Sequence, residues 1–343
     1  MDLSTNALCA KAKAMYGKRL KEEQYSELIR KDSIGEVVTY LKGHVGYQDA
    51  LKDINVRNIH RQQVEDLLKR EYFERCNKML KYIPRKNQEF YLKVLMKIEI
   101  EIILDKIQRV LFGSQEALTY DLPTYLEAKT SFAFHELVQA KNIQEIKECL
   151  MHSKYAKIMN KFDVVSFEDM SILEKELLDF YYQSYVLSIE KHFRGKTKQQ
   201  LLDVLYTLVE LKNMEKIYRL KTYFHFTPEQ IKKTVSLQYG RLNSNTLDQL
   251  VESKDGKEFL KKLSLSRYQA YYDDQEYAYI EYYIDTIKYN VAKRYLRFSS
   301  NAPVVYLTYS ILESIEIDNL KHIIEGIRYQ KDPSTIEEML ICM

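Results

Sequence analysis

An all-α fold built from related units is predicted by three features of the sequence. Glycine and proline are scarce: their nine and five copies make up about 4% of the 343 residues, against roughly 12% in average proteins. Apolar residues recur at intervals of three and four, as in Ile280, Ile284, Ile287 and Val291, which is the stripe of an amphipathic helix. Similar segments also return about every 105 to 110 residues. Strand-like alternation is scarce, so helices should form most of the structure.

The repetition is carried by three markers that recur in the same order. One combines an apolar residue, a glutamate, a second apolar residue four positions after the first, and a downstream Tyr or Lys followed by an aromatic residue. Its copies are Val64-Glu65-Asp66-Leu67-Leu68 with Tyr72-Phe73, Leu173-Glu174-Lys175-Glu176-Leu177 with Tyr181-Tyr182, and Ile280-Glu281-Tyr282-Tyr283-Ile284 with Lys288-Tyr289. A second marker recurs as Leu104-Asp105-Lys106-Ile107-Gln108-Arg109, Met214-Glu215-Lys216-Ile217-Tyr218-Arg219 and Leu320-Lys321-His322-Ile323. An earlier marker recurs as Leu41, Tyr47 and Leu51, as Leu150, Tyr155 and Met159, and with a longer gap as Leu250, Phe259 and Leu263.

Each copy is the size of a small domain, because solenoid repeats usually span roughly 20 to 50 residues. We therefore divide the chain into helical repeat units at 1–115, 116–224 and 225–343. Similar sequences form similar supersecondary units, and several such units tend to pack in a regular array or ring. Three domain-sized copies thus predict pseudo-threefold packing around an axis.

Within a unit, the first helices are expected to be short and capped. Ser33 and Glu36 have the spacing of a capping box, which predicts a helix over 34–42. Thr227 followed by Pro228 suits an N-cap and a first helical residue. Leu122-Pro123-Thr124 lies 105 residues earlier, so a helix should begin near each of these prolines.

A long helix, a break and a final helix are expected to follow in each unit. The breaks are predicted at Pro84, Gly195 and Pro303, since proline and glycine end or interrupt helices. The long helices are predicted at 58–82, 167–193 and 275–298, and the final helices at 87–111, 198–223 and 305–329.

Composition excludes several classes of protein. The uncharged stretches fall short of the roughly 20 apolar residues that cross a bilayer, and the first 30 residues mix charged with apolar side chains, unlike a secretory signal. The cysteines are isolated and lack metal-site spacing, which favours reduced thiols in the cytoplasm; they are Cys9, Cys76, Cys149 and Cys342. With 52 basic and 49 acidic residues the net charge is only +3, so nucleic acid is not expected as a main partner.

Two motifs resemble catalytic or metal sites. Gly195-Lys196-Thr197 matches the end of a phosphate-binding loop, but Glu190 stands where that loop needs its first glycine, so a helix-to-helix turn is expected. Asp273, Asp274 and Glu276 could hold Mg²⁺ through carboxylate oxygens. The corresponding stretches of the other units share a helix start without these carboxylates, which favours an interaction with the helix dipole.

No catalytic, cofactor or metal site is predicted from the remaining residues. The histidines are scattered, at His44, His60, His135, His152, His192, His225 and His322, and neither a nucleophile elbow nor a dinucleotide loop is present. The 29 tyrosines lack the basic groove that base stacking requires. Tyrosines such as Tyr277, Tyr279, Tyr282, Tyr283 and Tyr289 are expected to pack between helices.

The chain resembles the C subunits of the bacterial and archaeal V/A-type rotary ATPases, the family that includes the eukaryotic vacuolar d subunit. The resemblance covers most of the chain and does not depend on one short motif. It is clearest in Tyr16-Gly17-Lys18-Arg19-Leu20 with Tyr25, Leu28, Ser33, Glu36, Leu41, Tyr47 and Leu51, and in Glu316-Ile317-Asp318-Asn319-Leu320-Lys321.

Membership of that family implies a funnel-like body of three pseudo-threefold-related helical domains, with one copy in each complex. It implies a non-catalytic rotor subunit of the central stalk that binds the shaft subunits of D and F type and the membrane proteolipid ring. The chain would then lie on the cytoplasmic face of the membrane and transmit torque for H⁺ or Na⁺ translocation.

Two other interpretations of the residues stay open. One is a soluble scaffold of helical repeats with no membrane complex. The other is an α-helical enzyme that uses Asp273, Asp274 and Glu276 with a metal, for which Asp274→Asn would abolish activity.

Overall fold

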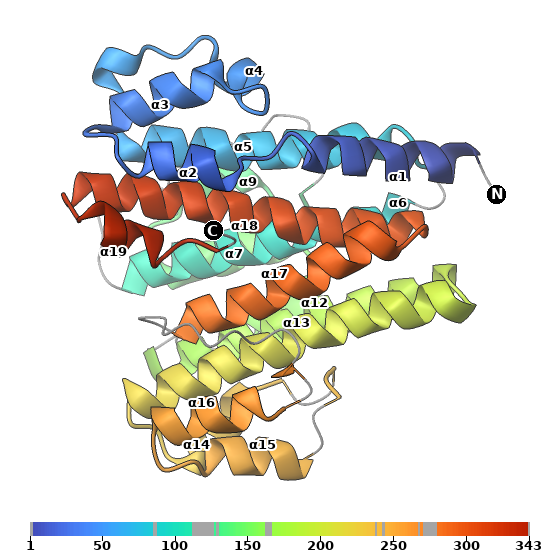
Figure 1. Ribbon diagram of the computed structural model, residues 1–343. Coiled ribbons are helices and arrows are strands. Elements are labelled where there is room, and N and C mark those ends of the chain that lie inside the picture. The colour runs from blue at the N-terminus through green and yellow to red at the C-terminus, as the bar shows by residue number, and fades with distance from the viewer. Residues whose placement is uncertain are drawn as a thin grey trace.

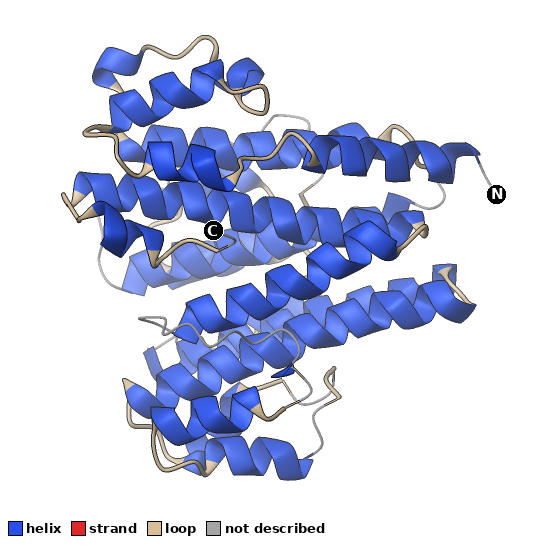
Figure 2. Cartoon of the chain, in the orientation of Figure 1, coloured by secondary structure: helices blue, strands red, loops and turns tan. Residues whose placement is uncertain are grey.

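The computed structural model describes residues 3–84, 88–111, 127, 130–161, 167–236, 239–241, 244–266, 268–269 and 280–341. All regular elements in these ranges are helices, which confirms the predicted all-α fold. Figures 1 and 2 show a stack of long helices in roughly the same direction, flanked by shorter ones. None of the described helices combines the length and the apolar character needed to cross a membrane.

The long and final helices lie close to their predicted positions. The long helices are α5 (Arg61–Leu80), α12 (Phe167–His192) and α17 (Ile280–Phe298). The final helices are α7 (Lys93–Leu111), α13 (Gly195–Thr222) and α18 (Ala302–Arg328). The predicted start of the third long helix, at 275, lies outside the described residues.

Two predicted boundaries differ from the structure. The helix expected over 87–111 is divided into α6 (Gln88–Tyr91) and α7, because the chain makes a tighter turn in which the Leu95 N–H donates to the Leu92 carbonyl at 3.0 Å. Pro303 does not precede α18 but lies in its first turn. A proline is tolerated there because the N–H that it lacks has no partner within the helix.

Shorter helices form three lobes, one before each long helix. The first lobe contains α2 (Glu22–Leu28), α3 (Ile34–Gly43), α4 (Gln48–Leu51) and the 3-10 helix η1 (Val56–Asn58). The second contains α9 (Phe134–Gln139), α10 (Ile143–Leu150) and α11 (Ala156–Met159). The third contains α14 (Pro228–Thr234), α15 (Ser244–Val251) and α16 (Gly256–Ser264). Two further helices, α1 (Leu3–Tyr16) and α19 (Pro333–Glu337), lie against α18.

One capped helix recurs in all three lobes. At the start of α3, α10 and α16 a short polar side chain accepts a hydrogen bond from the backbone N–H three residues later; the pairs are Ser33 with Glu36, Asn142 with Glu145, and Asp255 with Glu258. Each of these glutamates reaches back to the N–H one residue before the cap, on Asp32, Lys141 and Lys254 respectively. The cap predicted at Ser33 is therefore confirmed. The glutamate bonds the N–H of the residue before the cap, whereas in a capping box it bonds the N–H of the cap residue itself.

The capped helices correct the register of the third copy of the early marker. Leu263 lies eight residues after the cap Asp255, as Leu41 and Leu150 lie eight residues after theirs. Leu263 therefore corresponds to the first member of the marker, and the set Leu250, Phe259 and Leu263 was wrong. The tyrosine that follows is Tyr268, five residues after Leu263, as Tyr155 lies five residues after Leu150.

Each lobe packs on the final helix that precedes it in the repeat and on the long helix that follows. The second lobe lies against α7 and α12, and the third against α13 and α17. The first lobe lies against α5 and against α18, the final helix of the third unit, so that Leu41 and Tyr47 share a core with Leu320. The predicted unit boundaries at 115 and 224, and the funnel shape, stay predictions.

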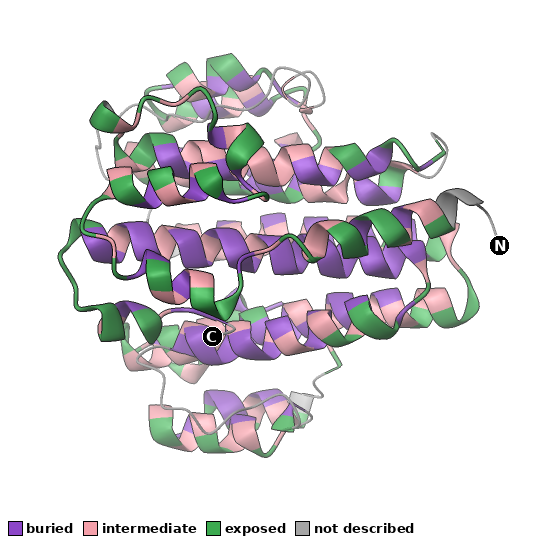
Figure 3. Ribbon diagram, turned by 45° about the horizontal axis from the view of Figure 1, so that its top comes forward, coloured by how far each residue is buried: buried purple, intermediate pink, exposed green. Residues whose placement is uncertain are grey.

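Helix α18 is the central element of the described structure. It contacts α1, α3, α5, α6, α13, α17 and α19, and most of its residues are buried. Figure 3 shows buried residues concentrated along the central helices and exposed ones on the lobes. Asn319 on α18 pairs through its amide with the backbone of Ile341, at 2.8 and 2.9 Å, as Asn213 on α13 pairs with Ser236. Equivalent positions on two final helices therefore make equivalent contacts.

Candidate partner-binding cleft

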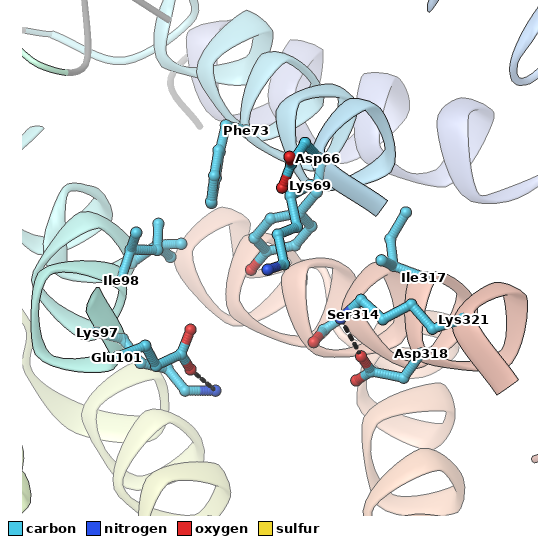
Figure 4. Close-up of a pocket in the computed structure, with 12 residues that line it drawn as sticks. Asp66, Lys69, Phe73, Lys97, Ile98, Glu101, Ser314, Ile317, Asp318 and Lys321 are labelled. Atoms are coloured by element: carbon cyan, nitrogen blue, oxygen red, sulfur yellow. Dashed lines mark hydrogen bonds and ion pairs between the residues drawn. The ribbon is translucent and has the colours of Figure 1, made fainter. Parts of the chain in front are cut away.

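A cleft lies between α5, α7 and α18, helices of the first and third units (Figure 4). Its cavity volume is about 110 Å³. The apolar part of its lining consists of Tyr72, Phe73, Val94, Ile98 and Ile317. The polar part consists of Ser314 and six charged residues, Asp66, Lys69, Lys97, Glu101, Asp318 and Lys321. An apolar pocket edged by charged side chains can receive one side chain of a partner and orient the residues beside it.

The charges of the cleft balance one another. Lys97 lies 3.6 Å from Glu101, and Lys321 lies 2.8 Å from Asp318. Desolvation opposes the negative charge of Asp318, but Lys321, Lys288 and Lys97 outweigh it and lower the pKa of that carboxyl. The cleft therefore presents both signs of charge at neutral pH, which suits an amphipathic helix carrying an apolar anchor between charged residues.

Ion pairs also connect neighbouring units. Arg219 on α13 lies 3.3 Å from Glu281 on α17, and Arg61 on α5 lies 2.5 Å from Glu325 on α18. Helix α13, the final helix of the second unit, is thus joined to the long helix of the third unit. Helix α18, the final helix of the third unit, is joined to the long helix of the first unit. These side chains are partly exposed, so each pair contributes little stability and acts mainly in orienting the helices.

Each final helix also carries a glutamate that attaches it to a lobe. In every case one carboxylate accepts a hydrogen bond from a tyrosine hydroxyl and another from a backbone N–H two or three residues before a short helix of the lobe. The three sets are Glu99 with Tyr155 and Ser131, Glu210 with Tyr268 and Arg241, and Glu316 with Tyr47 and Leu20. We call them the carboxylate anchors; all three glutamates are buried.

The anchors also position the cleft. Glu99 immediately follows Ile98 on α7, and Glu316 immediately precedes Ile317 on α18. Because successive residues of a helix move together, a carboxylate fixed by two hydrogen bonds fixes the apolar residue beside it. The cleft thus depends on buried polar contacts made by adjacent residues of the same helices.

The anchor on α18 differs from the other two because it adjoins a second buried carboxylate. Arg75 on α5 forms ion pairs with Glu313 on α18 and with Glu71, the latter at 2.9 Å. Its guanidinium also donates to the Gly46 carbonyl of the first lobe. Desolvation and the nearby Glu313 raise the pKa of Glu316 to about 7, although the hydrogen bond from Tyr47 and the charge of Arg75 act in the opposite direction.

We expect this raised pKa to make the attachment of the first lobe dependent on pH. A carboxyl whose folded pKa exceeds its unfolded value stabilises the folded state fully below the unfolded pKa, and that stabilisation is lost as pH rises through the folded pKa. From pH 4.5 to about 7 the expected loss is on the order of 3 kcal/mol. Hydrogen exchange of residues 20–59 across this range measures it. Glu316→Gln should flatten the dependence, and an unchanged slope would contradict the assignment.

The sequence-predicted candidate residues do not come together in a catalytic site. Gly195-Lys196-Thr197 begins α13 directly after the turn from α12, and the φ of Gly195 is 56°, so the predicted helix-to-helix turn is confirmed. Asp273, Asp274 and Glu276 lie outside the described residues. In the part of the chain that the structure describes, no three His, Cys, Asp or Glu side chains are grouped as metal ligands.

The tyrosines named in that prediction that the structure describes pack between helices, as expected. Tyr282, Tyr283 and Tyr289 are buried on α17, and Tyr277 and Tyr279 lie outside the described residues. The sequence did not single out the three anchor glutamates as a set. Their spacing of 111 and 106 residues is the signal by which the sequence could have revealed them. The sequence pattern obscured it, because it took Phe259 and not Tyr268 as the aromatic residue of the third unit.

Comparison with known proteins identifies the family to which this chain belongs. The model of the family described as the ATP synthase (C/AC39) subunit matches residues 8–339. The C subunit of the A-type ATP synthase of Methanosphaera stadtmanae is 24% identical, over 97% of this chain and 86% of the relative. That of Archaeoglobus fulgidus is 21% identical, over 98% of this chain and 96% of the relative. The chain therefore belongs to the family of ATP synthase C/AC39 subunits, which confirms the resemblance found in its sequence.

Proposed function

We propose that this chain is a non-catalytic rotor subunit of a V/A-type ATPase or ATP synthase. In this role it joins the central shaft, built from subunits of D and F type, to the membrane proteolipid ring on the cytoplasmic face. One copy in each complex transmits torque between ATP turnover in the head and H⁺ or Na⁺ translocation in the membrane. Family membership and the names of the relatives support this proposal.

The packing of the first lobe on α18 is the observation that carries the proposal. A body that transmits torque must resist shear between its parts, and here the first and third units share one apolar core. The Arg75 and Glu316 contacts add buried polar links across the same junction. Close-packed interiors have low compressibility and transmit strain, which suits an adapter between two rotating elements.

Reconstitution of the complex with and without this chain tests the proposal. Without it, ATP hydrolysis should continue while ion pumping into proteoliposomes is lost, because the head is no longer joined to the ring. Adding the purified chain back should restore pumping, and the chain alone should hydrolyse no ATP. Full pumping without the chain, or a turnover that persists through purification, would contradict the proposal. Absence from ring-containing membranes would favour a soluble scaffold instead.

The cleft is the proposed contact for the shaft. A shaft helix can place one apolar side chain beside Ile98 and Ile317 and pair its own charges with the mixed charges around them. Ile98→Asp would place a charge among these apolar groups and should weaken shaft binding in a pull-down with the purified shaft subunits. Lys141→Asp, on the exposed surface of the second lobe, is the matched control.

A further inference from the structure

The three turns between the long and final helices form one continuous face, which we call the hairpin face. Figure 1 shows the ends of α5, α12 and α17 gathered at the same end of the molecule as the start of α1. Direct contacts join them: Glu89 beside the first turn pairs with Lys191 at 2.9 Å, and Asn301 of the third turn donates to Gln200 beside the second at 2.7 Å. Lys13 of α1 donates to the Ser299 carbonyl at 3.3 Å.

Charge on the hairpin face is strongly segregated. Its described segments are 6–13, 78–84, 88–91, 186–200 and 290–301, and they contain 11 Lys and Arg residues but only two acidic residues, Glu89 and Glu190. The whole chain is nearly balanced, with 52 basic and 49 acidic residues. Both acidic residues are already engaged, Glu89 with Lys191 and Glu190 with Lys198 at 2.9 Å. The face therefore presents a positive surface to any partner.

Large apolar side chains protrude from the same face. Phe298 is 84% exposed, Leu187 is 58% exposed and Tyr82 is 38% exposed. Each has a basic residue beside it in the sequence or one helical turn away: Arg297, Lys191 and Lys81 respectively. A side chain as exposed as Phe298 projects from the surface, so these groups do not form the floor of a groove that would hold a partner side chain.

We propose that the hairpin face binds the surface of a membrane containing anionic lipids. Lys and Arg near such a surface are attracted to its headgroups, while single aromatic and aliphatic side chains enter the boundary between headgroups and acyl chains. Projecting apolar groups beside cations of one sign match that chemistry. A protein partner would instead be expected to meet a shaped, mixed-charge surface such as the cleft. The binding is shallow and reversible, and it does not depend on the proposed rotor role.

Vesicle co-sedimentation of the purified full-length chain tests this inference. Binding is expected to vesicles made of equal parts phosphatidylcholine and phosphatidylglycerol, and little binding to phosphatidylcholine alone. The triple variant Lys81→Glu, Arg194→Glu, Arg297→Glu should bind anionic vesicles about 100-fold more weakly, since each lost cation removes part of the attraction. Phe298→Ser alone should weaken binding several-fold without altering its salt dependence.

A matched control separates this face from net charge. Lys141→Glu, Lys257→Glu, Lys331→Glu changes the net charge by the same amount at exposed positions of the second lobe, the third lobe and the segment after α18. It should retain most of the vesicle binding, and both variants should keep the melting temperature of the parent. Equal binding to neutral vesicles, or an equal loss in the control, would overturn the inference. A third result would also overturn it: the parent chain binds no vesicles but binds the lipid-free proteolipid ring, and the hairpin variant loses that binding to the ring.

The outcome is separable from that of the reconstitution experiment. Vesicle binding is measured on the chain alone, whereas coupling is measured in the complete complex. Vesicle binding that is lost in the hairpin variant while its pumping stays normal would support the lipid contact and leave the rotor proposal standing. Loss of pumping on removal of the chain, with no vesicle binding by the chain, would overturn only the lipid contact.

Discussion

Replacing Glu99 with alanine is expected to lower the free energy of opening of the second lobe by about 3 to 5 kcal/mol. The Glu99 side chain is fully buried and accepts hydrogen bonds from Tyr155 and Ser131, both at 2.7 Å. It also pairs with Lys154 at 2.6 Å. The variant would remove the acceptor of the Ser131 N–H and leave the Tyr155 hydroxyl with its longer bond to the Met96 carbonyl, at 3.3 Å. An unsatisfied buried group costs about 1 to 3 kcal/mol. Hydrogen exchange of residues 130–161 measures the effect locally.

Glu101→Ala is the control for this prediction, because Glu101 lies on the same helix and pairs with Lys97 at 3.6 Å at the surface. Its expected cost is below about 1 kcal/mol. Tyr155→Phe should fall between the two, since it removes one donor and leaves the carboxylate with the others. A similar cost for Glu99→Ala and Glu101→Ala would mean that the buried anchor does not hold the lobe.

Replacing Arg75 with methionine is expected to release the first lobe from α18 at neutral and higher pH. Arg75 pairs with Glu313, and its charge also opposes the effect of Glu313 on the nearby Glu316, so removing it leaves two interacting buried carboxylates without this cation. Breaking a buried ion pair by removing one partner costs about 3 to 5 kcal/mol. The effect should shrink below pH 6, where protonated Glu316 no longer repels Glu313. Hydrogen exchange of residues 20–59 at two pH values measures both the release of the lobe and its dependence on pH.

A second substitution distinguishes charge from packing in this experiment. Combining Arg75→Met with Glu313→Gln removes the cation and one of the carboxylates, so much of the lost stability should return. Arg61→Met is the matched control, because Arg61 joins the same two helices through Glu325 but is partly exposed. Persistence of the full loss in the double variant would attribute the effect to lost packing.

The sequence predicted the local part of this fold well. Helix periodicity, the cap at Ser33 and the Thr227-Pro228 start depend on residues close together in the chain, and each matched the structure. The division of α6 from α7 was missed because Leu92 is neither glycine nor proline and carries no local signal for a turn. Pro303 was assigned to the break before the final helix, whereas it lies in the first turn of α18.

The contacts that build the candidate site were out of reach for a different reason. Tyr47 and Glu316 are 269 residues apart, and nothing in either neighbourhood of the sequence specifies the other. The cleft combines side chains from α5, α7 and α18, so its lining becomes visible only when helices of the first and third units are placed together. The hairpin face is similar, since its charge excess is spread over five segments that are each unremarkable alone.

The packing of the first lobe on α18 has a consequence for the order of synthesis. A ribosome adds roughly 5 to 20 residues each second, so residues 20–59 emerge on the order of tens of seconds before α18 (Ala302–Arg328). During that interval the nascent chain displays Leu41 and its apolar neighbours without the helix that covers them. The second and third lobes meet their supporting helices, α7 and α13, already made. The first lobe is thus made before the other two but completes its core after α18 is made, and it is the lobe that a chaperone would have to shield.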